Sequence, residues 1–149
     1  MFIVFALIVI SNGCSGLPKT AKINITIDPN PVPYDTEDEE WSFNVIFSEN
    51  NGVGVTLISL RFDSYDQQEE LVETQIVYEE DIIDWFDSNY LPAFSSLSSW
   101  IWYAGIGKYA IITVAGVDDN DSPIEATERV DYLPKYKAFL GVELDLKIR

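Results

Sequence analysis

Histidine is absent from this sequence of 149 residues, and cysteine occurs once, as Cys14. The absence of histidine removes the commonest general base and transition-metal ligand, and with them the Ser-His-Asp mechanisms. A single cysteine allows neither an internal disulfide nor a thiolate zinc cage. Any chemistry would therefore have to come from carboxylates, hydroxyls, lysine or tyrosine.

Basic residues are also scarce. Nine Lys and Arg stand against twenty-five Asp and Glu, which gives a formal net charge of −16. None of these charges precedes Lys19, so the imbalance belongs to the part of the chain that folds. Such a surface repels phosphate backbones and attracts cations. We therefore expect no nucleic-acid partner.

The composition is that of a folded protein. Apolar residues make up 47% of the chain and aromatic residues 13%, which is enough to build a packed core. The length fits one ordinary domain.

The amino-terminal segment has the pattern of a targeting sequence. The apolar run from Phe2 to Ile10 is too short to span a bilayer, which takes about 20 residues, but it fits the apolar region of a signal peptide. The stretch up to Gly13, followed by Cys14, resembles a bacterial lipobox. This resemblance implies cleavage before Cys14 and acylation of its sulfur. We predict a signal peptide over 1–13 and a lipid-anchored tether over 14–21; the alternatives are secretion without a lipid, or an ordinary buried first strand.

From residue 22 onward the apolar residues mostly alternate with polar ones, the period of half-buried strands. Strands are expected in eight stretches separated by turn residues: 22–28, 41–48, 55–65, 71–80, 97–105, 107–117, 124–133 and 139–149. The prolines at 29, 31 and 33 mark a loop, because proline cannot donate to a sheet ladder.

One segment, 79–92, breaks the alternation. It places Ile82, Ile83 and Phe86 on one helical face, after acidic residues that favour a helix start. We predict one short helix here. Together, one helix and about seven or eight strands indicate an all-β, immunoglobulin-like antiparallel sandwich of two sheets, formed by residues 22–149.

The stretch "GKYAIITVAGVDDNDSP" resembles a phrase near the end of bacterial immunoglobulin-like modules of surface proteins. Gly107 and Tyr109 fill its opening, Ile111 and Thr113 its strand, and Asp118 to Asp121 its turn. The resemblance implies a role in adhesion, spacing or display on a cell envelope, without catalysis.

Two groups of residues are candidate binding sites. Asp118, Asp119, Asn120 and Asp121 could ligate calcium, although the same residue types suit a solvated hairpin turn. Trp100 and Trp102 share one strand face, with Ile101 and Tyr103 on the other. The tryptophans could stack sugar rings if exposed, or belong to the core if buried.

No motif indicates an enzyme. The sequence has no Gly-rich phosphate loop and no nucleophile elbow, and among twenty-five acids chance carboxylate pairs are unavoidable. We expect a non-enzymatic, extracytoplasmic module on a bacterial cell surface or in a periplasm, anchored to the membrane through Cys14. Its partner is an envelope protein or a glycan. We expect no cofactor; the alternative is a calcium- or carbohydrate-binding module.

Overall fold

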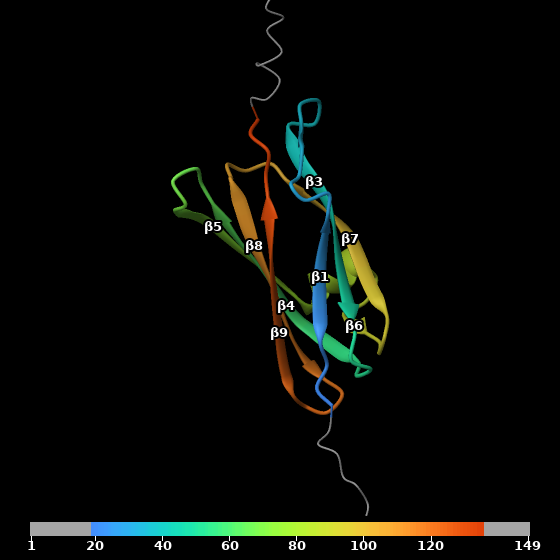
Figure 1. Ribbon diagram of the computed structural model, residues 1–149. Coiled ribbons are helices and arrows are strands. Elements are labelled where there is room, and N and C mark those ends of the chain that lie inside the picture. Colours follow the sequence, from blue (N-terminus) through green and yellow to red (C-terminus); the bar gives the residue numbers. More distant parts are fainter. Residues whose placement is uncertain (1–18, 136–149) are drawn as a thin grey trace, which may run out of the picture.

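A computed structural model describes residues 19–135, which form nine strands and one helix (Figure 1). The elements in chain order are β1 (Ile23–Asp28), β2 (Tyr34–Asp35), β3 (Glu40–Glu49), β4 (Val55–Tyr65), β5 (Leu71–Tyr78), α1 (Glu79–Phe86), β6 (Tyr90–Leu91), β7 (Ser96–Tyr103), β8 (Tyr109–Asp118) and β9 (Pro123–Asp131). Strands β2 and β6 have two residues each, so seven long strands make the sandwich.

The strands form two antiparallel sheets. In the first, β3 lies at the centre, with β1 and β2 on one side and β7 on the other. In the second, the order is β5-β4-β8-β9, and β6 pairs with the beginning of β4. This two-sheet arrangement with one short helix confirms the immunoglobulin-like sandwich that the sequence predicts.

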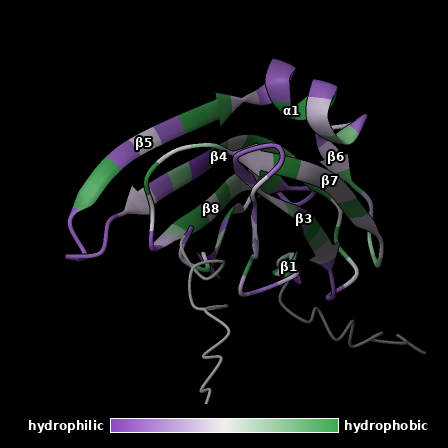
Figure 2. Cartoon of the chain, turned by 90° about the horizontal axis from the view of Figure 1, so that it is seen from above, coloured by the Kyte–Doolittle hydropathy of each residue, from purple (hydrophilic) through white to green (hydrophobic). Residues whose placement is uncertain are grey.

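Strict alternation along β3 builds the centre of the core. Trp41, Phe43, Val45 and Phe47 are all buried, and the residues between them lie on the outer face. On the opposite sheet, residues of β4 and β8 such as Leu60, Ile112 and Val114 are fully buried. The hydrophobic side chains of the two sheets therefore meet in a single core. Figure 2 shows hydrophobic and hydrophilic residues following one another along the strands.

The helix lies where the acidic residues Glu79 to Asp81 predict its start, and it follows β5 directly. Ile82 and Phe86 are buried, as predicted. Ile83 is not part of the buried face, because its side chain is 44% exposed. Trp85 takes its place and packs partly buried against Phe62 of β4, with ring centroids 6.2 Å apart.

The two ends of the described chain lie at opposite ends of the sandwich (Figure 1). The predicted signal peptide, the Cys14 anchor and the predicted strand over 139–149 all lie outside the described residues. Within residues 19–135, no helix has the length and apolar character needed to cross a membrane.

Candidate binding surface

The pairing of β7 with β3 decides which β7 side chains face the core. Ile101 pairs with Phe43 and Tyr103 pairs with Trp41, both of which are buried. Ile101 and Tyr103 therefore point inward, where they pack against the core. The tryptophans of the same strand face outward.

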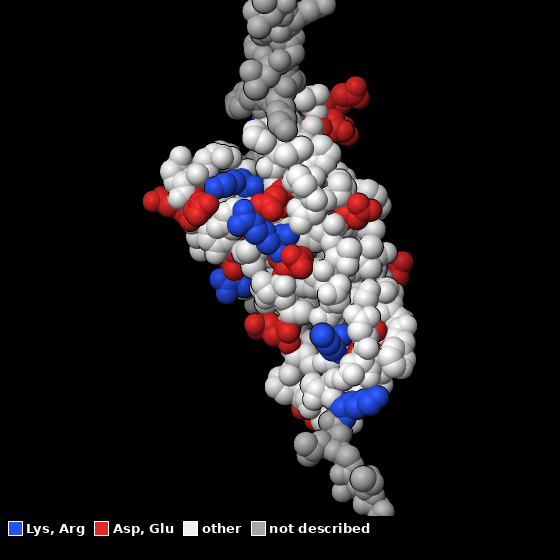
Figure 3. All heavy atoms as spheres, viewed as in Figure 1, with Lys and Arg blue, Asp and Glu red and all other residues white. Residues whose placement is uncertain are grey.

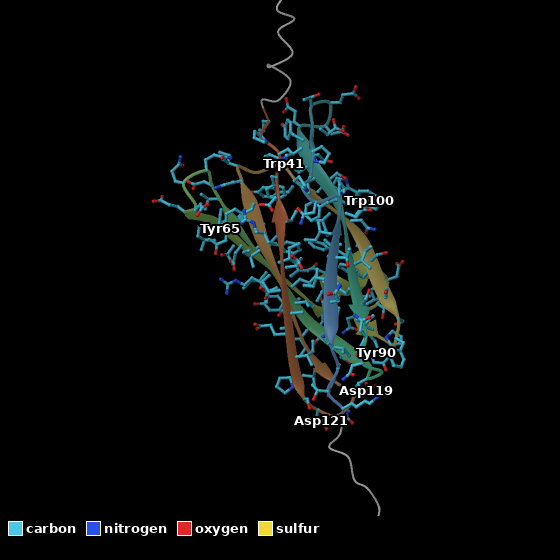
Figure 4. All side chains as sticks on the ribbon, viewed as in Figure 1. Trp41, Tyr65, Tyr90, Trp100, Asp119 and Asp121 are labelled. Atoms are coloured by element: carbon cyan, nitrogen blue, oxygen red, sulfur yellow. The ribbon has the colours of Figure 1, made fainter. Side chains whose placement is uncertain are left out.

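Trp100 and Trp102 are strongly exposed, with 52% and 63% of their surface accessible. Their backbone partners on β3 are Asn44 and Ser42. Figure 4 shows Trp100 on the side of the molecule formed by β3 and β7. Residues two apart on a strand are about 6.6 Å apart along it. The two indole rings thus form one apolar strip on an outer sheet face.

The rest of this face is mostly polar, and it also includes Ile46 of β3 and the acid Asp28 of β1, whose register partner is Asn44. Ser48 of β3 and Ser96 of β7 share a hydroxyl hydrogen bond of 2.8 Å. The register of β1 on β3 adds Asn24 and Thr26 to the same face. We call this surface, made by Trp100, Trp102 and their hydroxyl and amide neighbours on β1, β3 and β7, the tryptophan face.

The tryptophans differ from the aromatic residues on the outer face of the other sheet. There, Tyr65 and Tyr109 stack with ring centroids 4.8 Å apart, and the Arg129 guanidinium lies 3.8 Å from the Tyr109 centroid. Within residues 19–135, neither Trp100 nor Trp102 takes part in a ring pair or a cation–π contact. Their apolar surface is therefore available to a ligand.

A second feature is a groove of about 400 Å³ between the two sheets, on the side where β5 and β7 form the sheet edges. Its apolar lining includes Phe43, Phe62, Ile101, Tyr103 and Tyr132, and also Trp100 and Trp102, so the groove borders the tryptophan face. Seen from above, α1 lies on this same side of the molecule (Figure 2). The helix contributes Trp85 and Asp84 to the lining.

The groove also contains polar groups, but no lysine or arginine lines it. Its acids are Glu73 of β5 and Asp84. Burial raises the pKa of the Tyr103 hydroxyl, and the Glu73 charge adds to this effect. The same two influences, together with Tyr103, raise the pKa of Tyr132 further. Both tyrosines therefore remain neutral at physiological pH.

The acidic turn that follows β8 uses its first residue to hold the backbone. The Asp118 carboxylate accepts hydrogen bonds of 2.9 Å from the N–H groups of Ala21, Asn120 and Ser122. These bonds, the one from Ala21 first, hold the pKa of Asp118 below its ordinary value. The turn thus fastens the segment before β1 to the end of β8.

The other acids of the turn are more exposed. Asp119 accepts a hydrogen bond of 3.1 Å from the Tyr90 hydroxyl, and Asp121 has a left-handed backbone with φ of 59°. Figure 4 places Asp119 and Asp121 at the end of the sandwich opposite Trp41, so the acidic run 37–40 that precedes Trp41 lies far from them. Among the residues of the described range, no three carboxylate, His or Cys groups gather as metal ligands.

Sequence analysis missed two buried acids, Asp63 of β4 and Glu49, which is 1% exposed at the end of β3. Glu49 makes the larger number of hydrogen bonds to the backbone. Its carboxylate accepts hydrogen bonds of 2.7–3.3 Å from five backbone N–H groups, those of Lys22, Asn51, Gly52, Val53 and Phe94. Glu49 directly precedes the turn sequence Asn-Asn-Gly, and this position could have indicated that its carboxylate binds the backbone of the turn.

Charged side chains elsewhere are distributed over the surface. On the view in Figure 3, Lys and Arg lie beside Asp and Glu rather than in a patch of their own. The Lys108 ammonium lies 2.7 Å from Glu69, and the Arg129 guanidinium lies 2.6 Å from Asp131. Exposed pairs of this kind contribute little to stability.

No protein-family model matches the sequence, and no curated protein matches it either. The solved structures with a similar fold include the putative ApaA protein of Bordetella pertussis, at 15% identity and a TM-score of 0.49, covering 76% of this chain and 96% of that one. They also include the CARDB domain of the PF1109 protein of Pyrococcus furiosus, solved with di-metal ions, at 14% identity and a TM-score of 0.41. That match covers 77% of this chain and 90% of the domain.

Proposed function

We propose that this protein is a non-enzymatic, extracytoplasmic module of the bacterial cell envelope, tethered to the membrane through Cys14, and that it binds a glycan with its tryptophan face. The observation that carries the proposal is the exposure of Trp100 and Trp102 on an outer sheet face. Neighbouring exposed apolar side chains of this kind are typical of an interaction site.

The chemistry around the two rings favours a sugar. A pyranose ring has an apolar C–H face and a rim of hydroxyls, so it needs a flat apolar surface next to hydrogen-bonding groups. The tryptophan face offers the indoles together with the side chains of Ser42, Asn44 and Ser98. The net charge of −16 favours a neutral glycan over an anionic one.

A non-catalytic role is supported by what the buried acids do. The carboxylates of Glu49 and Asp118 accept hydrogen bonds from backbone N–H groups. Asp63 accepts from the Arg61 guanidinium at 2.9 Å and from the Thr74 hydroxyl at 2.6 Å. None of these three carboxylates is free to act as a general acid or base.

The second candidate function is calcium binding by the acidic turn, through Asp118, Asp119, Asn120 and Asp121. The turn would have to open to offer both oxygens of Asp118, since its present partners are N–H groups. A rise in melting temperature on adding calcium, abolished by Asp119→Asn or Asp121→Asn, would favour this function.

The test of glycan binding uses the full chain against a panel of neutral polysaccharides, with dissociation constants measured by calorimetry. We expect Trp100→Ala and Trp102→Ala each to weaken binding by about tenfold or more, with the fold retained in circular dichroism. Tyr78→Ala is the matched control, because Tyr78 is an aromatic residue of the other sheet and is 61% exposed. The absence of binding across the panel, or equal losses in all three variants, would refute the proposal.

A further inference from the structure

The groove between the sheets is bordered by two strands that each have a single long partner. β7 pairs with β3, and β5 pairs with β4; in the part of the chain that the structure describes, no strand lies on the outer side of either. Such edges present unpaired N–H and C=O groups that can accept a further strand. Seven of the eight β5 residues are exposed.

The position beside β7 is one that related sandwiches fill. In the seven-strand immunoglobulin arrangement, a fourth strand completes the sheet to which β1, β3 and β7 correspond. Here the chain passes from β5 into α1 and β6 instead, and β6 joins the other sheet. The helix takes part of that place, because α1 contacts β7 as well as β4 and β5. No strand covers the apolar lining of the groove, which includes Ile101 and Phe62, in the part of the chain that the structure describes.

The sequence contains a segment suited to this position. In residues 139–149, Val142, Leu144, Leu146 and Ile148 alternate with polar residues. That pattern is typical of a strand with one buried face. The stretch 142–148 has seven residues, and β7 has eight.

The described chain ends near the start of β3, the strand that pairs with β7. The Lys135 ammonium is 5.0 Å from the ring centroids of both Trp41 and Tyr34. Trp41 pairs with Tyr34 of β2 on one side and with Tyr103 at the end of β7 on the other. Neighbouring strands are about 4.8 Å apart, and the six residues 136–141 can span about 20 Å. The free edge of β7 is therefore within reach of residue 142.

We propose that residues 142–148 pair antiparallel with the free edge of β7 of the same chain, with their apolar side chains closing the groove between the sheets. Coming from Lys135, the segment runs from Tyr103 toward Ser96, opposite to the direction of β7. Glu143, Asp145 and Lys147 then face solvent. Trp100 and Trp102 also line the groove, so the segment would lie next to the tryptophan face. The tests below use no glycan, so their outcome does not depend on glycan binding.

Cysteine pairs test the placement. In the full chain carrying Cys14→Ser, Ser99→Cys is combined in turn with Val142→Cys, Leu144→Cys and Leu146→Cys, because Ser99 lines the groove. After mild oxidation, mass mapping of unreduced peptides should find an intrachain disulfide in at least one pair. The matched control replaces Ser99→Cys by Thr127→Cys on the exposed face of β9, where we expect no such bond.

Disulfides between chains would assign the groove to a second copy and overturn the proposal. It would also be overturned if no pair formed, or if the Thr127→Cys controls formed pairs equally well.

Hydrogen exchange gives a second measurement, free of introduced cysteines. The double variant Leu144→Asp, Leu146→Asp should accelerate exchange of β7 amides about tenfold or more, while β9 amides keep their rates. Its control, Glu143→Ser with Asp145→Ser, changes the opposite face of the segment and should leave β7 unchanged. Unchanged β7 exchange in the first variant, or equal acceleration in both, would contradict the pairing.

Discussion

At the scale of single residues, Glu49 shows how one buried charge can organise several loops. Burial by itself raises the pKa of a carboxyl group, but the backbone N–H donors outweigh it and lower the pKa of Glu49 to about 2. The donors come from the segment before β1, from the turn after β3 and from Phe94 before β7. One side chain thus fixes three stretches of chain at one end of the sandwich.

This arrangement predicts a dependence of stability on pH. Because the folded pKa is lower than the ordinary value of 4.5, ionised Glu49 stabilises the fold above about pH 4.5. That contribution, about 3 kcal/mol from the size of the shift, is lost as the pH falls toward 2. We expect Glu49→Gln to lower the free energy of unfolding at pH 7, and its difference from the wild type to shrink near pH 2. Denaturant titrations at several pH values measure both effects.

The control for this prediction is Glu37→Gln, which changes an exposed acid in the loop before β3, whereas Glu49 lies at the end of that strand. It should leave the free energy of unfolding nearly unchanged throughout. A Glu49→Gln difference that stayed constant from pH 7 to pH 2 would contradict the assigned role of the carboxylate.

At the scale of elements, the two faces of β3 have different tasks. Its inward residues, such as Phe43, are completely buried, while Ser42 and Asn44 lie on the tryptophan face. The buried face contributes to stability through the hydrophobic effect and packing. The outer face contributes to the proposed binding.

Substitutions on adjacent residues of β3 should therefore separate stability from binding. Phe43→Ala removes a fully buried ring and should lower the free energy of unfolding by about 3–5 kcal/mol. Ser42→Ala should change it by less than about 0.5 kcal/mol. Urea titration measures both values. Similar losses in the two variants would mean that β3 is not buried on one face only.

At the scale of the whole molecule, the chain enters the sandwich at one end and leaves it at the other (Figure 1). The segment before β1, which leads back toward Cys14, is fastened by Asp118 and Glu49. Under the proposed anchoring, the acidic turn lies next to the membrane and the loop before β3 lies farthest from it. The tryptophan face would then be held to the side, accessible to envelope polymers.

Anchoring predicts a clear change in the cell. Cys14→Ser should move the protein from the membrane fraction to the soluble fraction and remove the lipid mass increment, because several acyl chains give effectively permanent attachment. Ser15→Ala is the neighbouring control and should leave both properties unchanged. Membrane fractionation of Cys14→Ser equal to that of the wild type would contradict the lipid anchor.

Much of the fold could be predicted from local patterns. The alternation in β3 and the acids at the start of α1 identify their elements without any knowledge of contacts. Exposure of Ile83 could not be foreseen, because a short helix with apolar residues at 82, 83, 85 and 86 has several possible buried faces. The groove could not be predicted from the sequence either, because its lining residues come from five separate elements, β3, β4, β5, α1 and β7, and from Tyr132.

By itself, the sequence determined the charge, the lack of histidine chemistry and the two-residue period of the strands, because these depend on composition and on neighbours along the chain. The tertiary structure alone decided that Ile101 and Tyr103 face the core while Trp100 and Trp102 face solvent. It also decided that Asp118 accepts the backbone N–H of Ala21. The reason is the same in both cases. The orientation of the β7 side chains and the partner of Asp118 both depend on which distant segment lies alongside, and a local sequence pattern does not contain that information.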